Sequence, residues 1–398
     1  MLSLDEALER LLAGVGSTAA EVVSLADAVG RAPLERRLVA ASDVPPFTNS
    51  AMDGFAVLAA DGGSTRRLAG ESRAGGPAAP RVEPGVAVRI MTGAPIPEGA
   101  DAVVPLEEAR EEGPMLHVDR APQPGAHVRA AGHDVAAGAP VVLADAPLGS
   151  ASIGLLAAMG HGSIAVHRRP RVAILSTGDE LRPAGQPLAA GQVHDANGPA
   201  LAAAVVEAGG EPLLLKPAPD DAALVEDRLR EGIGRADLLI ASGGVSVGSH
   251  DHVRSAIERI GSLEFWRVAV QPGKPLAFGR IGERPVVGLP GNPVSALVTF
   301  ELFVRPMLRR MLELPGDGRP RLLVRAAAEL AKDPERRAFL RVRVERDGDG
   351  YRAVSAGGQA SSQLLPLASA NALLVVPEGL ARAEAGSTYE AILLGPVT

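Results

Sequence analysis

Cysteine is absent from the 398-residue chain, so the protein can form neither disulfide bonds nor thiolate-ligated zinc sites. No uncharged segment reaches the roughly 20 apolar residues that a membrane-spanning helix requires. The first 20 residues carry Asp5, Glu6 and Glu9 in place of the basic stretch and apolar run of a secretory signal. These features predict a water-soluble protein of the cytoplasm that does not bind membranes.

Aromatic residues make up only 3% of the chain, and its formal net charge is −7 with both signs interspersed. Proteins that bind nucleic acid usually present a basic face, and those that bind single strands add aromatic side chains for base stacking. The composition therefore predicts no nucleic-acid partner. The 46 glycines and 33 prolines instead indicate many tight turns between short strands.

The first 150 residues change character once. Residues 3–14 are predicted to form an amphipathic helix, because Ser3 and Glu6 match a capping box and leucines recur on one face. A second short helix is expected after Ser24. From about residue 35 to 150, short apolar runs alternate with proline and glycine, which is typical of all-β structure.

From residue 170 the pattern alternates between strands and helices, which predicts a largely parallel sheet covered on both faces. Beyond a linker at 314–320, the pattern becomes β-rich again and predicts a small barrel or sandwich. The expected strands are 171–175, 212–215, 238–241, 265–270, 286–289, 339–345, 351–354, 373–376 and 389–394, and the expected helices are 199–208, 221–233, 252–260 and 293–314, the last bent at Pro306.

In an open parallel sheet, ligands bind in the crevice beyond the carboxyl ends of the strands. Glycines in these loops let backbone N–H groups turn toward an anion, and exposed carboxylates are the hard oxygen ligands that Mg²⁺ takes. Lys274 adds a compact positive charge for an oxyanion. Together the loops predict a metal-assisted phosphate site. They are 176–180, 218–221, 242–251, 271–275 and 290–295, with Gly243, Gly244 and Gly248 as the anion-binding glycines and Glu180, Asp220 and Asp251 as the metal ligands.

Each of these features also has a purely structural interpretation. Asp220 or Asp221 and Asp251 could cap the helices that follow them, a glycine pair after a strand is usually a turn, and a single lysine is usually solvated. His250 and His252 are more simply surface residues. The structural interpretations weaken because all five loops are expected at one edge of one sheet. The chain has no G-x-x-x-x-G-K-[ST] motif, which excludes a P-loop NTPase.

Two segments of the β-rich region also carry chemical groups. Residues 45–54 contain Asp53-Gly54, which by itself predicts a hairpin turn. Residues 91–97 form a loop of small residues, structural by default.

At these residues the chain resembles the MoeA/gephyrin E-domain family, the molybdopterin molybdenumtransferases. No single segment is decisive, but the ordered set is highly specific. The matching segments are PPFTNSAMDGFAV (45–57), RIMTGAPIPEGADAVV (89–104), STGDEL (176–181), SGGVSVGSHD (242–251), PGKPLAFG (272–279) and GLPGNPVSAL (288–297).

The resemblance implies a multi-domain α/β plus β protein that forms an elongated homodimer. Its central α/β domain would be similar to the stand-alone enzymes that adenylate molybdopterin, with β-rich N-terminal domains and a small C-terminal β-barrel. The implied boundaries are residues 1–34 with 145–169 for a helical and extended subdomain, 35–144 for a β-rich subdomain, 170–317 for the α/β domain and 318–398 for the barrel.

The implied reaction inserts molybdate into adenylyl-molybdopterin, with Mg²⁺ present and AMP released. By resemblance the catalytic positions are Asp53, Asp134, Glu180, Asp220, Asp251 and Lys274, with Thr92, Arg336 and Ser361 as further functional positions. The crevice loops add, as residues expected to bind the pterin phosphate and the adenylate, Thr177, Gly178, Ser242, Gly243, Gly244, Ser246, Gly248, Pro290, Gly291, Asn292, Pro293 and Ser295.

Three positions depart from the family pattern: Thr48 stands for the usual aspartate, Gln271 for a lysine and Ala338 for an acid. The missing lysine bears on molybdate binding, for which Arg336 or Arg337 is the expected substitute. Asp53 lies more than a hundred residues before the α/β crevice, so the dimer is expected to build each site from both chains.

Two other functions remain open. One is an enzyme that only adenylates molybdopterin, and the other is a non-catalytic, gephyrin-like scaffold whose barrel docks a partner. The additional β subdomains disfavour an enzyme that only adenylates, and the acidic loops disfavour a non-catalytic scaffold. For the molybdenumtransferase, transient contacts with a molybdopterin adenylyltransferase and with molybdoenzymes are expected.

Overall fold

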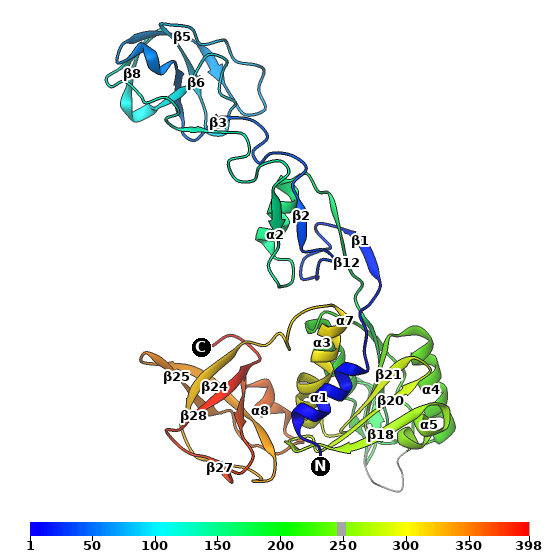
Figure 1. Ribbon diagram of the computed structural model, residues 1–398. Coiled ribbons are helices and arrows are strands. Elements are labelled where there is room, and N and C mark those ends of the chain that lie inside the picture. Colours follow the sequence, from blue (N-terminus) through cyan, green and yellow to red (C-terminus); the bar gives the residue numbers. More distant parts are fainter. Residues whose placement is uncertain (245–251, 398) are drawn as a thin grey trace.

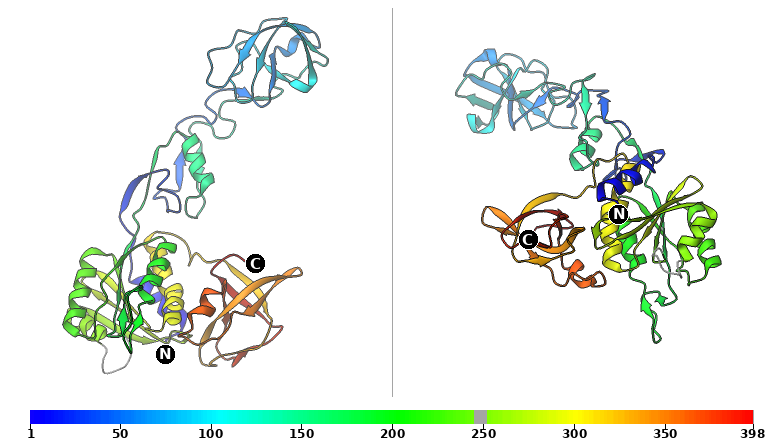
Figure 2. Two further views of the ribbon diagram at one scale, coloured as in Figure 1. Left: turned by 180° about the vertical axis from the view of Figure 1, so that it is seen from behind. Right: turned by 60° about the horizontal axis from the view of Figure 1, so that its bottom comes forward.

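The computed structural model describes residues 1–244 and 252–397, and at Phe265 and Trp266 it describes only the backbone. The molecule is elongated (Figure 1), with a β-rich head (residues 49–129) at one end and a broad base at the other. A thin stem, made of residues 20–39 and 140–167, joins them. The base contains an α/β unit (residues 171–311) beside a C-terminal barrel (residues 321–393), as the two further views in Figure 2 also show.

The head is built on one six-stranded sheet that encloses a small apolar core around Phe55, Val57 and Leu116. Its strands, in spatial order, are β7 (Ala102–Pro105), β4 (Gly54–Val57), β6 (Val86–Ile90), β5 (Thr65–Ser72), β9 (Met115–Val118) and β8 (Ala109–Glu112). Where the chain enters and leaves the head, β3 (Asn49–Ser50) pairs with β10 (Val128–Arg129). This confirms the β-rich structure predicted for this region.

The stem consists of two short antiparallel ribbons and one helix. The ribbons pair β1 (Ala20–Ser24) with β12 (Ser163–His167) and β2 (Arg37–Val39) with β11 (Pro140–Val142), and the helix is α2 (Ser150–Ala158). The helix predicted after Ser24 is wrong: residues 25–30 form turns, in which Ser24 Oγ accepts a hydrogen bond from the backbone N–H of Asp27. Serine at the start of a turn makes the same local hydrogen bond as at a helix N-cap, so the sequence signal was ambiguous.

The α/β unit carries a six-stranded sheet whose first four strands are parallel. Alternate residues of β13 enter two different cores: Val172 and Ile174 pack with α3 and α6, while Ala173 and Leu175 pack with α4 and α5. The order is β16 (Glu211–Leu214), β13 (Arg171–Ser176), β17 (Leu238–Ser242), β21 (Arg284–Leu289), β20 (Pro275–Ile281) and β18 (Ser262–Arg267), with helices α3 (Asn197–Glu207), α4 (Ala222–Arg235), α5 (His252–Ile260) and α6 (Pro293–Thr299).

The sheet differs from the prediction at its far edge. Residues 275–281, not anticipated as a strand, form β20, which pairs antiparallel with both β21 and β18. The predicted strand 265–270 divides into β18 and the short β19 (Val270–Gln271), which leaves the sheet and pairs with the barrel. A tight turn at Gly282, whose φ is +58°, reverses the chain into β21.

Helix α1 (Leu4–Ala13) begins with the predicted capping box, in which Ser3 and Glu6 exchange hydrogen bonds of 3.1 and 2.9 Å. Its buried face, with Ala7 and Leu11, joins the core of the α/β unit. The predicted long helix is also present, as α6, the π-helical η3 (Phe300–Val304) and α7 (Arg305–Met311). The irregular turn precedes Pro306, which has no N–H for an intrahelical hydrogen bond.

The C-terminal strands close into a five-stranded barrel, which decides between the predicted barrel and sandwich. The closure is made by pairing of β24 with β26. The ring consists of β24 (Arg337–Asp347), β25 (Gly350–Ser355), β22 (Arg321–Ala326), β28 (Thr388–Leu393) and β26 (Ala372–Val376), with α8 (Leu364–Ala368) beside it. In the described part of the chain, no helix is long and apolar enough to cross a membrane.

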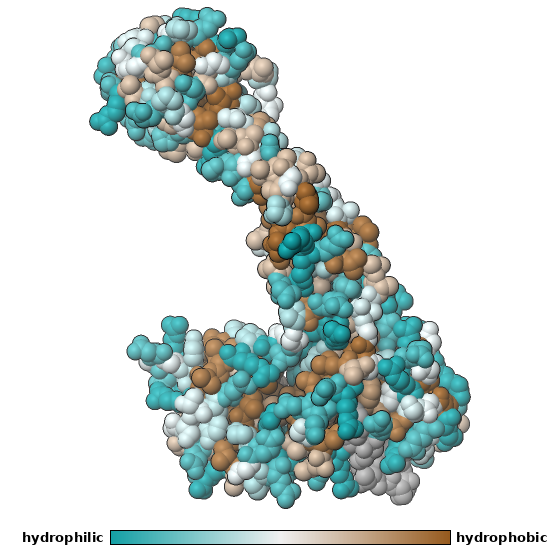
Figure 3. All heavy atoms as spheres, in the orientation of Figure 1, coloured by the Kyte–Doolittle hydropathy of each residue, from teal (hydrophilic) through white to brown (hydrophobic). Residues whose placement is uncertain are grey.

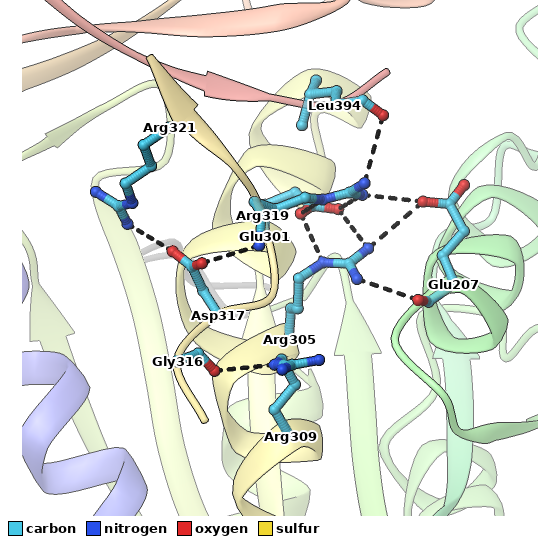
Figure 4. A network of polar contacts seen from close by, with 9 residues as sticks. All are labelled: Glu207, Glu301, Arg305, Arg309, Gly316, Asp317, Arg319, Arg321 and Leu394. Atoms are coloured by element: carbon cyan, nitrogen blue, oxygen red, sulfur yellow. Dashed lines mark hydrogen bonds and ion pairs between the residues drawn. The ribbon is translucent and has the colours of Figure 1, made fainter. Parts of the chain in front are cut away.

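An ion-pair network joins the barrel to the α/β unit (Figure 4). Glu301 of η3 accepts hydrogen bonds from Arg305 at 2.7 Å and from Arg319 at 2.9 Å. Arg319 also bonds Glu207 of α3 and the carbonyl oxygen of Leu394. Burial alone would raise the pKa of Glu301, but the two guanidinium groups outweigh it and hold that pKa below its usual value. The network thus fixes the linker between the two parts.

Candidate functional site

The loops at the carboxyl ends of β13, β16, β17 and β21 are tied together by their backbones. Thr177 donates its N–H to the carbonyl oxygen of Ser242 at 3.2 Å, and Gly178 donates to Ala218 at 3.1 Å. Gly243 donates to Leu289 at 3.3 Å. The ends of these four strands therefore meet at one edge of the sheet, as expected for an open parallel sheet.

Two glycines shape the centre of this edge. Gly243 and Gly244 have φ values of +89° and +62°, a region that residues with a side chain rarely adopt. A Cβ atom on Gly243 would lie 2.9 Å from the carbonyl oxygen of Thr177, so the chain can pass this closely only without a side chain. Beside them, Thr177 Oγ1 is buried and has no hydrogen-bond partner among the described residues. A buried hydroxyl without a partner is a candidate ligand contact.

The acidic residues of the crevice divide into structural and available ones. Asp221 caps α4, accepting hydrogen bonds from the N–H groups of Ala223 and Leu224 at 2.9 Å each. Asp179 accepts the N–H of Asp220 at 3.0 Å and so joins two loops. The carboxylates of Asp220 and Glu180 are exposed and have no protein partner in the described part of the chain. These two carboxylates are therefore free to meet a ligand or cation.

The described residues contain no cluster of three or more histidine, cysteine, aspartate or glutamate side chains that could hold a metal ion. Asp251, the third expected magnesium ligand, lies outside the described residues, as do Ser246 and Gly248 of the same loop. The fit to Mg²⁺ therefore depends on Glu180 and Asp220. Glu180 folds back over Gly178, where a Cβ atom would lie 2.5 Å from its carboxylate, so the glycine makes room for the acid.

The segment Asp195–Gly198 was not identified from the sequence, although it lies in the same crevice. Asp195 accepts hydrogen bonds from Ser176 Oγ at 3.1 Å and from the N–H of Gly198 at 2.9 Å. Asn197 donates to Ser242 Oγ at 2.8 Å and to the carbonyl oxygen of Gly291 at 2.7 Å. An Asp-x-Asn-Gly sequence precedes the helix predicted at 199–208, but this local pattern does not show that Asn197 bonds to loops far away in the sequence.

The barrel reaches the crevice through Ser361. Its Oγ accepts a hydrogen bond from Asn292 Nδ2 at 3.0 Å, and its carbonyl oxygen accepts the N–H of Val294 at 3.1 Å. Arg341, only 1% exposed, holds the segment before Ser361 by donating to the carbonyl oxygens of Gly358 and Ala360 at 3.2 Å each. Burial lowers the pKa of Arg341. Ser361 therefore contacts the Pro290–Ser295 loop. Arg341, which holds the segment before Ser361, was not identified from the sequence.

The positively charged part of the predicted site lies where β19 pairs with β24. Lys274 is exposed, and Arg336 is ion-paired with Asp333 at 2.6 Å. Gln271 lies opposite Ala338 in the strand register, so two of the departures from the family pattern face each other. Gln271 Oε1 accepts the N–H of Asp333 at 2.8 Å, so the neutral side chain now supports this loop.

Arg336 and Arg337 are both engaged by carboxylates, Arg336 by Asp333 and Arg337 by Glu378 and Asp5. Either arginine, in the role of the missing lysine, would therefore have to bind molybdate while it remains ion-paired with its carboxylate partner. Asp333 itself is held ionised: the N–H of Glu335 and the guanidinium of Arg336 lower its pKa.

In the head, Asp53 and Thr92 lie together. Asp53 Oδ1 accepts hydrogen bonds from the N–H of Thr92 at 2.6 Å and from its hydroxyl at 2.7 Å. These bonds lower the pKa of Asp53. The predicted hairpin turn at Asp53-Gly54 is wrong, because β4 pairs with β6 and β7 rather than with the preceding β3.

Asp134 and Thr48 lie just outside the head, in the segments by which the chain leaves and enters it. The N–H of Asp134 donates to the carbonyl oxygen of Val44 at 2.9 Å, and its side chain is exposed. Thr48 Oγ1 accepts the N–H of Ala131 at 3.4 Å. Asp53 and Thr92 thus belong to the head, and Asp134 to the segment by which the chain leaves it. The stem separates the head from the crevice of the same chain (Figure 1).

Three family models match consecutive parts of the chain. The MoeA N-terminal region (domain I and II) matches residues 2–160, a probable molybdopterin binding domain matches residues 173–310, and the MoeA C-terminal region (domain IV) matches residues 324–394.

Curated relatives and solved structures agree with these matches. The chain is 41% identical over 366 residues to molybdopterin molybdenumtransferase 2 of Mycobacterium tuberculosis, a match that covers 89% of this chain and 90% of the relative. It is 40% identical over 316 residues to the molybdopterin molybdenumtransferase of Haemophilus influenzae, with 78% of each chain covered. The crystal structure of a molybdopterin biosynthesis MoeA protein from Pyrococcus horikosii superposes over 100% of both chains with a TM-score of 0.81 and 31% identity.

Proposed function

The chain belongs to the MoeA family, and on that premise we propose that it is a molybdopterin molybdenumtransferase. It inserts molybdate into adenylyl-molybdopterin and releases AMP. The observation that carries the proposal is the single edge of the sheet where a positive-φ glycine pair, the Pro290–Ser295 loop and two unpaired carboxylates meet. Such an edge offers backbone donors for phosphate and oxygen ligands for a cation.

The phosphate groups of the substrate are proposed to lie against Gly243, Gly244 and the loop 290–295. Backbone N–H groups at glycine turns bind anions without a charged side chain. Such fixed donors can also stabilise the charge that develops when the phosphoanhydride is cleaved. Thr177 Oγ1 supplies the buried hydroxyl that has no protein partner among the described residues. Ser361, held by Asn292, closes the same loop from the barrel side.

Mg²⁺ dependence is part of the proposal. Glu180 and Asp220, with Asp251, would hold the ion, since exposed carboxylates at this edge supply the oxygen ligands that Mg²⁺ prefers. When bound, the ion supplies charge neutralisation at the phosphoanhydride.

Molybdate is proposed to bind beside Lys274 and Arg336. Lys274 is exposed and can reach an oxyanion as a compact charge, while Arg336 keeps spare N–H donors besides those that bind Asp333. With glutamine at position 271, the region lacks the lysine that could bind the oxyanion directly, although Ala338 opposite it also removes an acid of the family pattern. We therefore expect a weaker affinity for molybdate than in relatives that keep the lysine.

A homodimer with shared sites completes the proposal. Asp53 and Thr92 lie in the head, which the stem holds away from the base of its own chain (Figure 1). The stem exposes apolar side chains, among them Val22 (71%), Val39 (64%) and Val142 (66%), and apolar atoms are visible along the stem face in Figure 3. A second copy that covers this surface would bring its head to the crevice by two-fold symmetry.

In the cytoplasm, the enzyme would receive its substrate from a molybdopterin adenylyltransferase and pass its product to molybdoenzymes. The alternative of a stand-alone adenylyltransferase predicts ATP consumption rather than AMP release. A pure scaffold predicts neither.

The direct test is an assay of AMP release from adenylyl-molybdopterin, with and without molybdate and Mg²⁺. The proposal expects AMP release that requires both. Glu180→Gln should lower the rate at least tenfold while Glu9→Gln, an exposed glutamate of α1, leaves it unchanged. AMP release that is absent, or that is independent of molybdate, would contradict the proposed function.

A further inference from the structure

We infer that Asn197 is a positioning residue that sets the separation of the two phosphate-binding loops. The inference rests on the proposed function and adds a residue to which no role has been assigned. Asn197 lies at the first turn of α3, on the carboxyl edge of the sheet, between the ends of β17 and β21.

The side-chain amide of Asn197 bridges these two loops directly. Its Nδ2 donates to Ser242 Oγ, one residue before the glycine pair, and to the carbonyl oxygen of Gly291 in the Pro290–Ser295 loop. The orientation of the amide is settled by chemistry, since a backbone carbonyl oxygen can only accept a hydrogen bond. Both N–H donors of one group are therefore used to hold two separate loops.

The two loops that Asn197 joins are also linked through their backbones. Gly243 donates its N–H to the carbonyl oxygen of Leu289 at 3.3 Å, where β21 ends and the Pro290–Ser295 loop begins. The loop spacing is thus set by a backbone hydrogen bond at one point and by the Asn197 amide at another. A small change in this spacing moves the backbone donors on both sides of the proposed phosphate site, and such sites tolerate little displacement.

Asn197 is itself held in place by its neighbours in the sequence. Asp195 accepts hydrogen bonds from Ser176 Oγ and from the N–H of Gly198, which fixes the turn into α3 to the end of β13. A Cβ atom on Gly198 would lie 2.6 Å from Asp195 Oδ2, so a side chain there would displace the Asp195 carboxylate. The turn is therefore rigid, and the Asn197 side chain projects from it at a defined position.

The test substitutes Asn197→Asp, which keeps the size of the side chain but replaces the donor by an acceptor facing the carbonyl oxygen of Gly291. The expected result is an AMP dissociation constant raised at least tenfold, with a loss in melting temperature no larger than that of the control variant described below. KM for adenylyl-molybdopterin should rise by more than kcat falls. Asn197→Ala, which removes both hydrogen bonds without adding repulsion, should raise the AMP dissociation constant less than Asn197→Asp does.

Asn371→Asp is the matched control. Asn371 also donates to two backbone carbonyl oxygens, those of Val344 at 3.0 Å and Pro396 at 2.9 Å, but it does so in the barrel. It should lower the melting temperature and leave the AMP dissociation constant unchanged. An AMP affinity of both Asn197 variants equal to that of the wild type would overturn the inference. A wild-type protein that does not bind AMP would instead contradict the proposed function.

Discussion

At the scale of single residues, some side chains of the predicted site are already oriented by hydrogen bonds within the protein. Asp53 is the clearest case, since both the backbone N–H and the hydroxyl of Thr92 converge on one of its oxygens. Hydrogen bonds to a carboxylate favour its charged form, which is why the pKa of Asp53 is lowered. Asp53 therefore presents a fixed negative charge and an oriented second oxygen.

Thr92→Val should raise the pKa of Asp53 toward its ordinary value, because it removes the hydroxyl bond and keeps the backbone one. The stabilisation that Asp53 contributes is present above the pKa of the unfolded chain and is lost as the pH falls through the folded pKa. With a higher folded-state pKa, the stabilisation by Asp53 should therefore be lost at a higher pH than in the wild type. An NMR titration of the Asp53 carboxyl carbon measures the shift. Thr65→Val, elsewhere in the head, is the control, and an unchanged Asp53 pKa in Thr92→Val would refute the assignment.

Much of the candidate site could be anticipated from residue types in loops after strands, because parallel strands bring their carboxyl ends to one edge. Asn197 and Arg341 could not, since their importance lies in hydrogen bonds to backbone groups far away in the sequence. The same limit explains Gly54. It was taken as a turn residue, whereas its small size is needed between neighbouring strands.

At the scale of elements, β4 shows why that glycine is required. A Cβ atom on Gly54 would lie 2.1 Å from the carbonyl oxygen of Val104 in β7. Gly54→Ala should therefore force β4 and β7 apart and destabilise the head by about 1–3 kcal/mol or more. Chemical denaturation measures the change. Gly16→Ala, where no atom lies within 4 Å of the added methyl group, is the control. Equal denaturation midpoints for wild type and Gly54→Ala would contradict this explanation.

The elements of the α/β unit could be predicted better than their pairing. Helix α5 and the first three parallel strands follow from periodicity, but the reversal at Gly282 that makes β20 antiparallel gives only a weak local signal. The junction of η3, the linker and the barrel was not predicted, because Arg319 pairs with Glu301 and Glu207 only after the linker has packed against η3 and α3, whereas the Glu301–Arg305 pair is a local i,i+4 contact.

Glu301→Gln tests that junction. It leaves Arg305, whose side chain is 4% exposed, without its principal partner, and breaking a buried pair in this way costs about 3–5 kcal/mol. Because the pKa of Glu301 lies below its usual value of 4.5, its contribution is complete above that pH and disappears as the pH falls further. The stability difference from wild type should be large at pH 7 and shrink under acid conditions.

Unfolding free energies measured at pH 7 and at a pH below 4.5, with Glu9→Gln on the exposed face of α1 as control, decide the matter. A difference that is independent of pH would show that the charge of Glu301 is not what stabilises the junction.

At the scale of the whole molecule, the shape limits where an active site can be. The head carries Asp53 and Thr92, the base carries the crevice, and the stem between them consists of two-stranded ribbons and one helix (Figure 1). The order of β-rich, α/β and β-rich regions was predictable from composition and periodicity. The elongated arrangement was expected only from the resemblance, because few local signals report how far apart two parts of a chain lie.

A site shared between two chains is tested most directly by complementation between two inactive variants, Asp53→Asn in the head and Glu180→Gln in the crevice. After subunit exchange, random pairing makes about half of the dimers mixed, and each mixed dimer has one intact site and one with both changes. Molybdate-dependent AMP release should therefore return to about a quarter of the wild-type rate. A mixture that stays as inactive as either variant alone would contradict a site shared between two chains.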